Sequence, residues 1–241
     1  MKVLSQSARR YLTAVTGVLS RPQKFHALVY LAGLIWPIQF RSIRTIAGQF
    51  GGGDVDGLGH FIRHATNRPA QMAKASQDFV AGRVRGQDIS LIIDDTTCRR
   101  DAKKIEGIGT HHSQDGLIQG LCAVTAVVRA AGKTWAWDVV GYVSRKSVSP
   151  EVFRSKIEIA LSIINGARMK LGRSVTVLMD SWYSCEEILN TIAFANWLYV
   201  AAVKVNRNVI VNTRKTPVRP TWPRGRGTTR PCGCPNGASF G

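Results

Sequence analysis

The chain has 241 residues, 44% of them hydrophobic, which is enough to bury one large core or two small ones. Its formal net charge of +18 is uneven: Lys and Arg number 12 against 3 acidic residues in 1–86, 14 against 12 in 87–204, and 7 against none in 205–241. Basic flanks beside a nearly neutral middle favour a polyanionic partner, nucleic acid above all, over a merely soluble basic protein.

The cellular compartment follows from cysteines and apolar runs. Five scattered cysteines, without a second pair at zinc-ligand spacing, argue against a disulfide framework and a zinc knuckle. The first residues lack the apolar region of a signal peptide, and the stretch 27–40 is too short for a membrane span and contains Pro37. We therefore expect a cytoplasmic, nucleoid-associated protein with no membrane part.

Residues 1–86 are predicted to form a basic helical segment. Apolar residues recur at helical spacing between residues 11 and 19, and again between residues 43 and 50 after Arg41 and Arg44. Three glycines at 51–53 break the chain before a second apolar stripe that carries Arg63. This pattern is typical of a helix-turn-helix DNA reader and equally of an ordinary helical bundle with solvated arginines, so both interpretations stay open.

Residues 87–211 are predicted to form an α/β domain. Three strands in an antiparallel meander are expected at 89–93, 121–131 and 134–143, the first ending in Asp94 and Asp95. A helix is expected to start at Ser149-Pro150-Glu151, followed by a fourth strand at 175–179 that ends in Asp180. Ser184 and Glu187 are placed as a capping box for a second helix, and a fifth strand follows at 197–205. The predicted fold class is thus a mixed sheet in the succession β-β-β-α-β-α-β, behind an N-terminal helical segment.

Residues 212–241 differ in kind from the rest. They hold five of the nine prolines and six basic residues, with no acid, so we predict a disordered tail. It fits a flexible DNA-binding arm, and it fits out-of-frame translation after a frameshift; the nucleotide sequence downstream of codon 212 distinguishes the two.

Asp95 and Asp180 each follow an apolar strand, 85 residues apart. If the two strands are neighbours in one sheet, their carboxylates converge, and a divalent cation relieves the repulsion between them. Hard oxygen ligands select Mg²⁺ or Mn²⁺, and two such ions support in-line phosphoryl transfer. A single aspartate after a strand is explained as well by a turn, but two in these positions of a basic chain favour a metal site. Asp94 should face the opposite side of the sheet.

The residues around these aspartates resemble a known family. The strings IDDTT at 93–97, KIEGIGTHH at 104–112 and VLMDSWYS at 177–184, in this order, are similar to DDE transposases of bacterial insertion sequences, in the branch with a β-rich insertion. The likeness covers roughly residues 40–211. It implies an RNase H-like fold, Asp95 and Asp180 as the first and second catalytic metal ligands, DNA cleavage and transfer at element ends, and a homodimer on DNA.

The sequence departs from that family at the third catalytic acid. The family places a glutamate on a later helix, in a Tyr/Arg/Glu/Lys-type signature, whereas no Asp or Glu follows Glu187 here. Glu186 and Glu187 come too soon after Asp180 to replace it. We therefore expect a C-terminally truncated site with impaired cleavage, unless another chain supplies the third ligand. The alternatives are a non-catalytic DNA-binding remnant and a different RNase H-like nuclease, such as a resolvase.

Smaller signals concern contacts with DNA. The adjacent His111 and His112 are expected to face solvent in a hairpin loop, and Trp135 and Trp137 share one strand face on which core packing is favoured over base stacking. Basic residues near the motifs and in the helical segment are candidates for phosphate contact. They are Arg41, Arg44, Arg63, Arg99, Arg100, Lys103 and Lys104.

Overall fold

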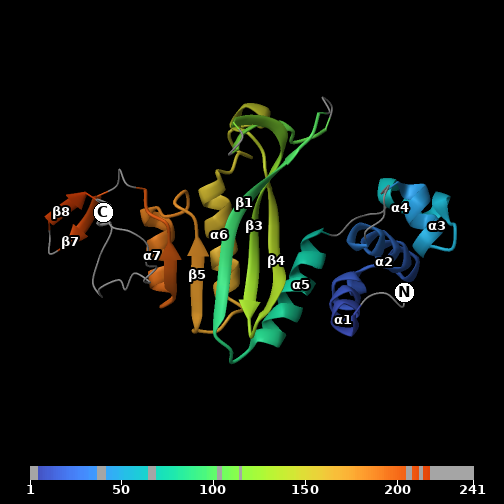
Figure 1. The fold of residues 1–241 in the computed structure, drawn as a ribbon, viewed down its shortest axis with the longest axis horizontal. Coiled ribbons are helices and arrows are strands. Elements are labelled where there is room, and N and C mark those ends of the chain that lie inside the picture. Colours follow the sequence, from blue (N-terminus) through green and yellow to red (C-terminus); the bar gives the residue numbers. More distant parts are fainter. Residues whose placement is uncertain are drawn as a thin grey trace, which may run out of the picture. The chain divides into compact units, whose positions relative to one another are not determined.

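The structure is a computed structural model that describes residues 5–36, 42–64, 69–101, 105–113, 116–204, 208–211 and 214–217. Its backbone contacts divide the chain after Arg85 into an N-terminal and a C-terminal unit, shown in Figure 1 and taken one at a time below. Arg41, Lys103, Lys104 and most of the predicted tail lie outside the described residues. In the part that is described, no helix is long and apolar enough to cross a membrane.

The N-terminal unit is helical. Its elements are α1 (Gln6–Val15), the 3₁₀ turn η1 (Thr16–Val18), α2 (Arg21–Ile35), α3 (Ile43–Phe50), α4 (Val55–His64) and α5 (Pro69–Val84). Val29 of α2, Ile46 of α3 and Leu58 of α4 are buried together in one core. Between α3 and α4 the chain turns at Gly52 and Gly53, whose φ angles of 64° and 88° suit glycine and strain other residues. The helix, glycine turn and helix expected from the sequence therefore form and share a core.

The C-terminal unit is built on a mixed sheet. Its strands are β1 (Ile89–Arg99), β2 (Gly109–Ser113), β3 (Gly116–Ala130), β4 (Lys133–Tyr142), β5 (Val175–Met179) and β6 (Leu198–Ala201). The sheet runs β2-β3-β1-β5-β6, with β4 also paired to β3; β1 is antiparallel to β3 and parallel to β5, and β5 is parallel to β6. The 3₁₀ turn η2 (Arg145–Ser147) and α6 (Lys156–Arg168) follow β4, and α7 (Glu186–Phe194) follows β5. Apart from the additional strand β2, this is the RNase H-like α/β succession predicted from the sequence.

The core of this unit follows from alternation along the strands. Every second side chain is buried in β5 and in the first five residues of β1, and Leu91 and Val177 have no exposed surface. Helices α6 and α7 contact each other and contribute fully buried isoleucines such as Ile164 and Ile188. Each such side chain stabilises the fold by about 1.5–3 kcal/mol on burial. Trp137 of β4 also packs in the core, with 1% of its surface exposed.

Helix α6 begins later than predicted. Residues 149–153 form a turn in which the N–H of Phe153 donates to the carbonyl of Ser149 at 3.0 Å. The N-cap is Ser155, whose Oγ accepts from the N–H of Glu158 at 3.2 Å while the Glu158 carboxylate accepts from the N–H of Ser155 at 2.6 Å. This reciprocal capping box satisfies two backbone donors at once, so it determines the start of the helix in place of Ser149-Pro150-Glu151.

The start of α7 was also predicted wrongly. Ser184 does not cap the helix, because its hydroxyl donates to the carbonyl of Ser181 at 3.0 Å. The N-cap residue is Cys185, which makes no side-chain bond to the free backbone donors of the helix. Glu187 is therefore not held by a capping box with Ser184.

Three strands were not expected from the sequence, namely β2, β7 and β8. β2 pairs with the beginning of β3, and β1 continues past Asp95 to Arg99, so the meander is longer than the apolar runs that predict it. β7 (Asn208–Val211) pairs with β8 (Arg214–Pro217), so the segment predicted to be disordered from residue 212 contains a strand. The Val-Ile-Val run at 209–211 has high strand propensity, and a two-residue connection lets the next residues pair back on it.

Gly120 provides a test of the strand arrangement. It lies in β3 opposite Arg99 of β1 and Gly109 of β2, and a Cβ atom there would collide with the backbone carbonyl of Cys98. Gly120→Ala should lower the free energy of unfolding by about 2 kcal/mol because the strands must shift apart. Urea denaturation measures this. Gly141→Ala in β4, where the added methyl meets nothing within 4 Å, is the control and should stay near wild type. Equal stability of the two variants would contradict this packing.

Candidate active site

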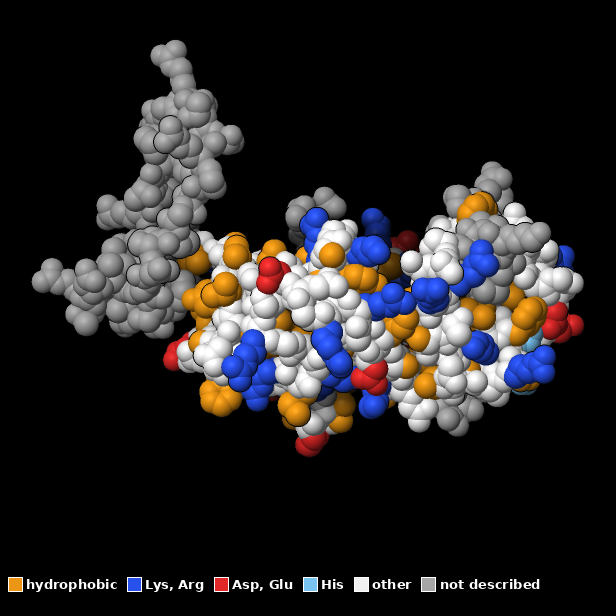
Figure 2. Space-filling view, turned by 90° about the horizontal axis from the view of Figure 1, so that it is seen from below, with side chains coloured by type: hydrophobic (Ala, Val, Ile, Leu, Met, Phe, Trp, Pro, Cys, Tyr) orange, Lys and Arg blue, Asp and Glu red, His pale blue; other side chains and the backbone are white. Residues whose placement is uncertain are grey.

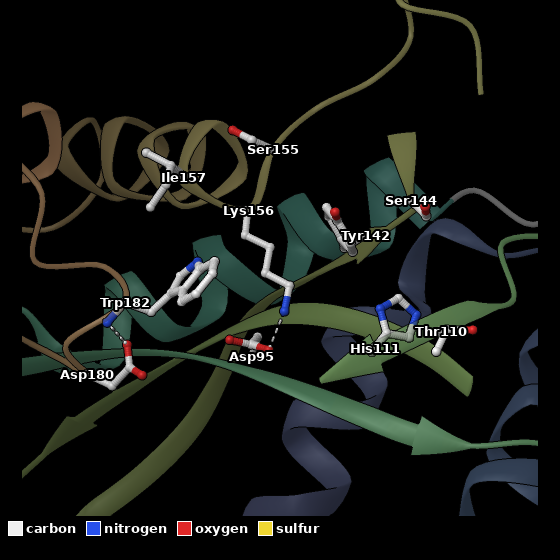
Figure 3. A pocket seen from close by; sticks show the side chains of 10 residues that line it. All are labelled: Asp95, Thr110, His111, Tyr142, Ser144, Ser155, Lys156, Ile157, Asp180 and Trp182. Carbon is white, nitrogen blue, oxygen red and sulfur yellow. Dashed lines mark hydrogen bonds and ion pairs between the residues drawn. The ribbon is translucent and has the colours of Figure 1, made fainter. Parts of the chain in front are cut away.

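Asp95 and Asp180 lie in one pocket. The parallel register of β1 and β5 pairs Ile93 with Met179, so both aspartates follow at the same edge of the sheet. Asp95 is still within β1, paired with Val124 of β3, whereas Asp180 comes directly after β5. Both side chains line a cavity of about 460 Å³ (Figure 3). The fold thus brings together the two acids selected from the sequence.

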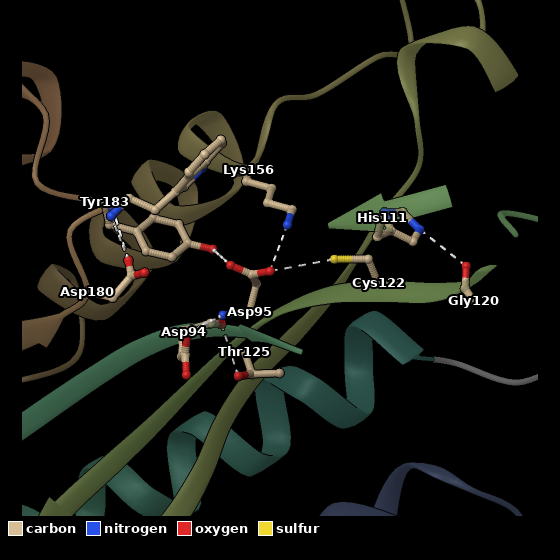
Figure 4. Close-up of polar contacts among 10 residues, drawn as sticks. Asp94, Asp95, His111, Gly120, Cys122, Thr125, Lys156, Asp180 and Tyr183 are labelled. Carbon is tan, nitrogen blue, oxygen red and sulfur yellow. Dashed lines mark hydrogen bonds and ion pairs between the residues drawn. The ribbon is translucent and has the colours of Figure 1, made fainter. Parts of the chain in front are cut away.

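Both carboxylate oxygens of Asp95 have protein partners (Figure 4). Lys156 at the start of α6 places its Nζ 2.7 Å from Oδ2, and the Tyr183 hydroxyl donates to Oδ1 at 3.3 Å. The thiol of Cys122 lies 3.9 Å from Oδ2. The Asp95 and Lys156 side chains are 23% and 18% exposed, so this ion pair is only partly screened by water.

The protonation of Lys156 follows from its neighbours. Burial alone lowers the pKa of its ammonium group, but the hydrogen bond to Asp95 and the charge of that carboxylate outweigh burial and raise the pKa above the ordinary value. Lys156 is therefore a cation at neutral pH. Its Nζ also lies 5.4 Å from the ring centre of Tyr142, a cation–π contact on the other side of the pocket.

The turn after β5 orders Asp180 and Tyr183 together. Asp180 Oδ1 accepts from the N–H of Trp182 at 2.9 Å and from the N–H of Tyr183 at 3.3 Å. The Tyr183 side chain is fully buried, and burial, followed by the charge of Asp95, raises the pKa of its phenol well above the usual range. Tyr183 is thus a neutral hydrogen-bond donor that ties the Asp180 turn to Asp95.

Asp94 points away from this site. It is exposed, it does not line the pocket, and its Oδ1 accepts from the N–H of Asp95 at 2.8 Å. Its carbonyl accepts from the Thr125 hydroxyl at 3.1 Å. Successive residues of a strand face opposite sides, so Asp94 and Asp95 have different surroundings, as expected from the sequence.

His111 lies in the pocket wall, which the sequence did not predict. It is 5% exposed in β2, and its Nε2 donates to the carbonyl of Gly120 at 3.2 Å. Burial lowers the pKa of its imidazole and the charge of Lys156 adds to this, against opposing effects of the Gly120 bond and Asp95. The expectation that His111 faces solvent is wrong because β2 is a paired strand, whose alternation turns this side chain inward. The side chain of His112 lies outside the described residues.

The remaining pocket residues surround Lys156. Figure 3 shows its side chain reaching toward Asp95, with Trp182 and Asp180 on one side and His111 and Tyr142 on the other. Trp182 is 55% exposed, and Lys204 Nζ lies 5.1 Å from its ring centre. Tyr183 and Trp182 belong to a string selected from the sequence, but Lys156 does not. The Ser155/Glu158 capping box in the sequence indicates that Lys156 begins a helix. No sequence pattern indicates that Lys156 pairs with Asp95.

The predicted DNA-contacting arginines lie outside the pocket. Arg44 on α3 and Arg63 on α4 are exposed in the N-terminal unit, and Arg99 and Arg100 are exposed at the end of β1. Arg99 Nε is 3.6 Å from a carboxylate oxygen of Asp101. Figure 2 shows Lys and Arg side chains spread over the visible face among few acidic ones.

The pocket acids fit a divalent ion as two ligands. Mg²⁺ is commonly bound by one or two carboxylates, with water and substrate phosphate oxygens completing its shell, and Asp95 and Asp180 provide such a pair. Over the residues with a described position, no group of three His, Cys, Asp or Glu side chains able to hold a metal is found. Glu186 and Glu187 are exposed on α7 and do not line the pocket.

His111 should make stability depend on pH. Its folded pKa is below the ordinary 6.5, so at pH values just below 6.5 the unfolded chain binds a proton that the folded chain does not. The free energy of unfolding therefore rises with pH up to about 6.5 and falls as the pH drops below it. In His111→Gln the loss of stability between about pH 7.5 and about pH 5.5 should be smaller than in wild type, by urea denaturation. His60→Gln, an exposed site on α4, is the control; identical pH profiles of His111→Gln and wild type would refute the assignment.

Comparison with known proteins places this chain in a family. A family model described as DDE superfamily endonuclease matches residues 14–235. Among solved structures, a piggyBac transposase synaptic complex with hairpin DNA is 10% identical, with a TM-score of 0.45, over 82% of this chain and 48% of that one. A Mos1 strand transfer complex is 11% identical, with a TM-score of 0.28, over 74% and 58%. The chain thus spans about half the length of these proteins. No curated protein matches. On the family model, which covers most of its length, the chain belongs to the DDE superfamily endonucleases.

Proposed function

We propose that the chain is an insertion-sequence DNA transposase whose Asp95 and Asp180 hold a divalent metal ion at the phosphodiester to be cut. One observation carries the proposal: the two acids come from adjacent parallel strands and line one pocket. Family membership and the net charge of +18 agree with a phosphodiester substrate. The branch with a β-rich insertion remains a prediction from the motifs.

The chain's own groups have defined tasks in this proposal. DDE superfamily endonucleases depend on a divalent metal, and we assign Mg²⁺ or Mn²⁺ to Asp95 and Asp180. When bound, such an ion activates a water or 3′-hydroxyl and stabilises the leaving oxygen. The sheet fixes Asp95, the turn N–H groups orient Asp180, and the Tyr183 hydroxyl holds Asp95 from the second side. Rigid elements of this kind preorganise a site.

DNA is the proposed partner, both the terminal repeats of the element and the target. Arg44 and Arg63, on the two helices around the glycine turn, are assigned to DNA contact in the N-terminal unit, and Arg99 and Arg100 beyond Asp95. DNA contact by Arg41, Lys103 and Lys104 remains a prediction from the sequence. We further propose a homodimer on DNA, acting at the nucleoid in the cytoplasm.

The number of acids limits the expected activity. Among the residues that the structure describes, Asp95 and Asp180 are the acids that line the pocket, and we expect cleavage and strand transfer to be slow unless a third ligand comes from elsewhere. The Asp95–Lys156 ion pair favours a second candidate function, a DNA-binding protein without cleavage, because the carboxylate already has a cation. A third candidate is a resolvase-like nuclease, in which the last catalytic acid lies at another position.

Cleavage assays separate these functions. With Mg²⁺ or Mn²⁺ and DNA carrying the element's terminal repeats, we expect slow nicking that drops by at least about 100-fold in Asp95→Ala and in Asp180→Ala. Asp94→Ala, which removes the neighbouring but outward-facing acid, is the matched control and should retain activity. Binding without any nicking would support the DNA-binding function instead. If both alanine variants still nick DNA at the wild-type rate, the assignment of the metal site is wrong.

The two helical arginines make a separate prediction about binding. Arg44→Ala and Arg63→Ala should each weaken DNA binding and lower the slope of log K against log salt by about 1, because each removes a phosphate contact. Fluorescence anisotropy over a salt series measures both quantities. Lys74→Ala on α5, which removes an exposed cation already paired with Asp78, is the control. If all three variants behave alike, the helices around the glycine turn do not read DNA.

A further inference from the structure

Lys156 stands in a position that is unfavourable for a cation. It is the first residue of α6, where the free backbone N–H groups and the helix dipole make the potential positive. It is also largely buried, with 18% of its side chain exposed. Both conditions disfavour a lysine, so the attraction of Asp95 at 2.7 Å has to offset them. The Lys156 cation is therefore held in this place by one carboxylate, which is itself a candidate metal ligand.

The ammonium group and a metal ion would compete for the same oxygen. Asp95 Oδ1 already accepts from Tyr183, and Oδ2 accepts from Lys156 with the Cys122 thiol beside it, so a metal ligated by Asp95 shares this carboxylate with the ammonium group. Tyr183 is fully buried and tied into the Asp180 turn, whereas Lys156 has a long flexible stem in an open pocket. Two cations sharing one carboxylate oxygen repel strongly in a partly buried site. Lys156 is thus the donor that can leave.

We propose that Lys156 is an internal stand-in for the metal at Asp95: it neutralises the carboxylate until a divalent ion binds, then leaves and contacts a phosphate of the DNA. This rests on the proposed function and deepens it. The released ammonium group remains in a pocket that Asp95 and Asp180 share with Tyr142, whose ring already faces it. A lysine is a mobile point charge suited to a phosphate oxygen. Lys156 is therefore a positioning residue that couples metal binding to DNA binding.

The first test measures Mn²⁺ binding without DNA, by electron paramagnetic resonance of the free ion. Lys156→Met removes the competing charge and should bind Mn²⁺ about tenfold more tightly than wild type, in the range usual for groups that contact a metal ligand. Lys156→Arg keeps a cation and should stay near wild type, as should Lys133→Met, an exposed lysine at the start of β4. Thermal unfolding checks each fold, and Lys156→Gln replaces the Met variant if that one does not fold. Unchanged or weaker Mn²⁺ binding by the neutral variants would overturn the proposal.

The second test measures DNA binding with and without Mn²⁺. Without metal, Lys156 is held by Asp95, so Lys156→Met should leave DNA affinity within about twofold of wild type. With Mn²⁺ bound, the same substitution should weaken binding several-fold and lower the salt slope by about 1, and Lys133→Met should do neither. A loss of DNA affinity that is the same with and without metal contradicts the coupling.

Asp95→Ala and Asp180→Ala separate this inference from the function on which it rests. If neither variant reduces Mn²⁺ binding, the metal site itself is absent, and both proposals fail. If both variants abolish Mn²⁺ binding while Lys156→Met leaves it unchanged, the metal site stands and only the role of Lys156 is rejected.

Discussion

Ile93 of β1 pairs in parallel with Met179 of β5, and this register determines what the pocket contains. Because both strands end their buried stretch at the same level, the acids that follow them meet at one edge of the sheet. The register is fixed by burial, since a slip of one residue would turn Leu91 and Val177 out of the core. The same slip would exchange Asp95 for Asp94, which faces the other side. The packing of the core therefore selects which of two adjacent aspartates enters the site.

The electrostatics of the pocket follow from that placement. Asp95 is less than a quarter exposed, so its charge needs partners, and it obtains a cation from α6 and a phenol from the Asp180 turn. Burial lowers the pKa of His111 and the charge of Lys156 adds to this effect, while the imidazole is anchored to β3 through the Gly120 carbonyl. The start of α6 and the turn after β5 are thus linked to β1 through one carboxylate. A change at any of them alters the charge that a metal ion or phosphate would meet.

Local sequence patterns predicted an element correctly where one interaction, such as hydrophobic burial, dominates. They were misleading where two similar signals, such as two helix caps, compete. The buried runs at 89–93 and 175–179 form the expected strands, because their hydrophobic burial is large. Helix starts were harder, since Ser149-Pro150-Glu151 and Ser155/Glu158 are both good caps and only the second closes a reciprocal box. His111 was misplaced for a related reason: its short strand has few apolar residues and forms because β3 offers it an edge.

The sequence by itself determined the fold class, the two strand-end aspartates and the family-like motifs around them, because these depend on periodicity and on neighbours along the chain. Only the tertiary structure decided that Lys156, 61 residues from Asp95, is its counter-cation and that Tyr183 and His111 complete the surroundings of the acids. Such pairings depend on how a helix start is brought over a strand end. Nothing in the local pattern of either segment encodes the other, because a charge pair depends on distance in space and not on separation along the chain.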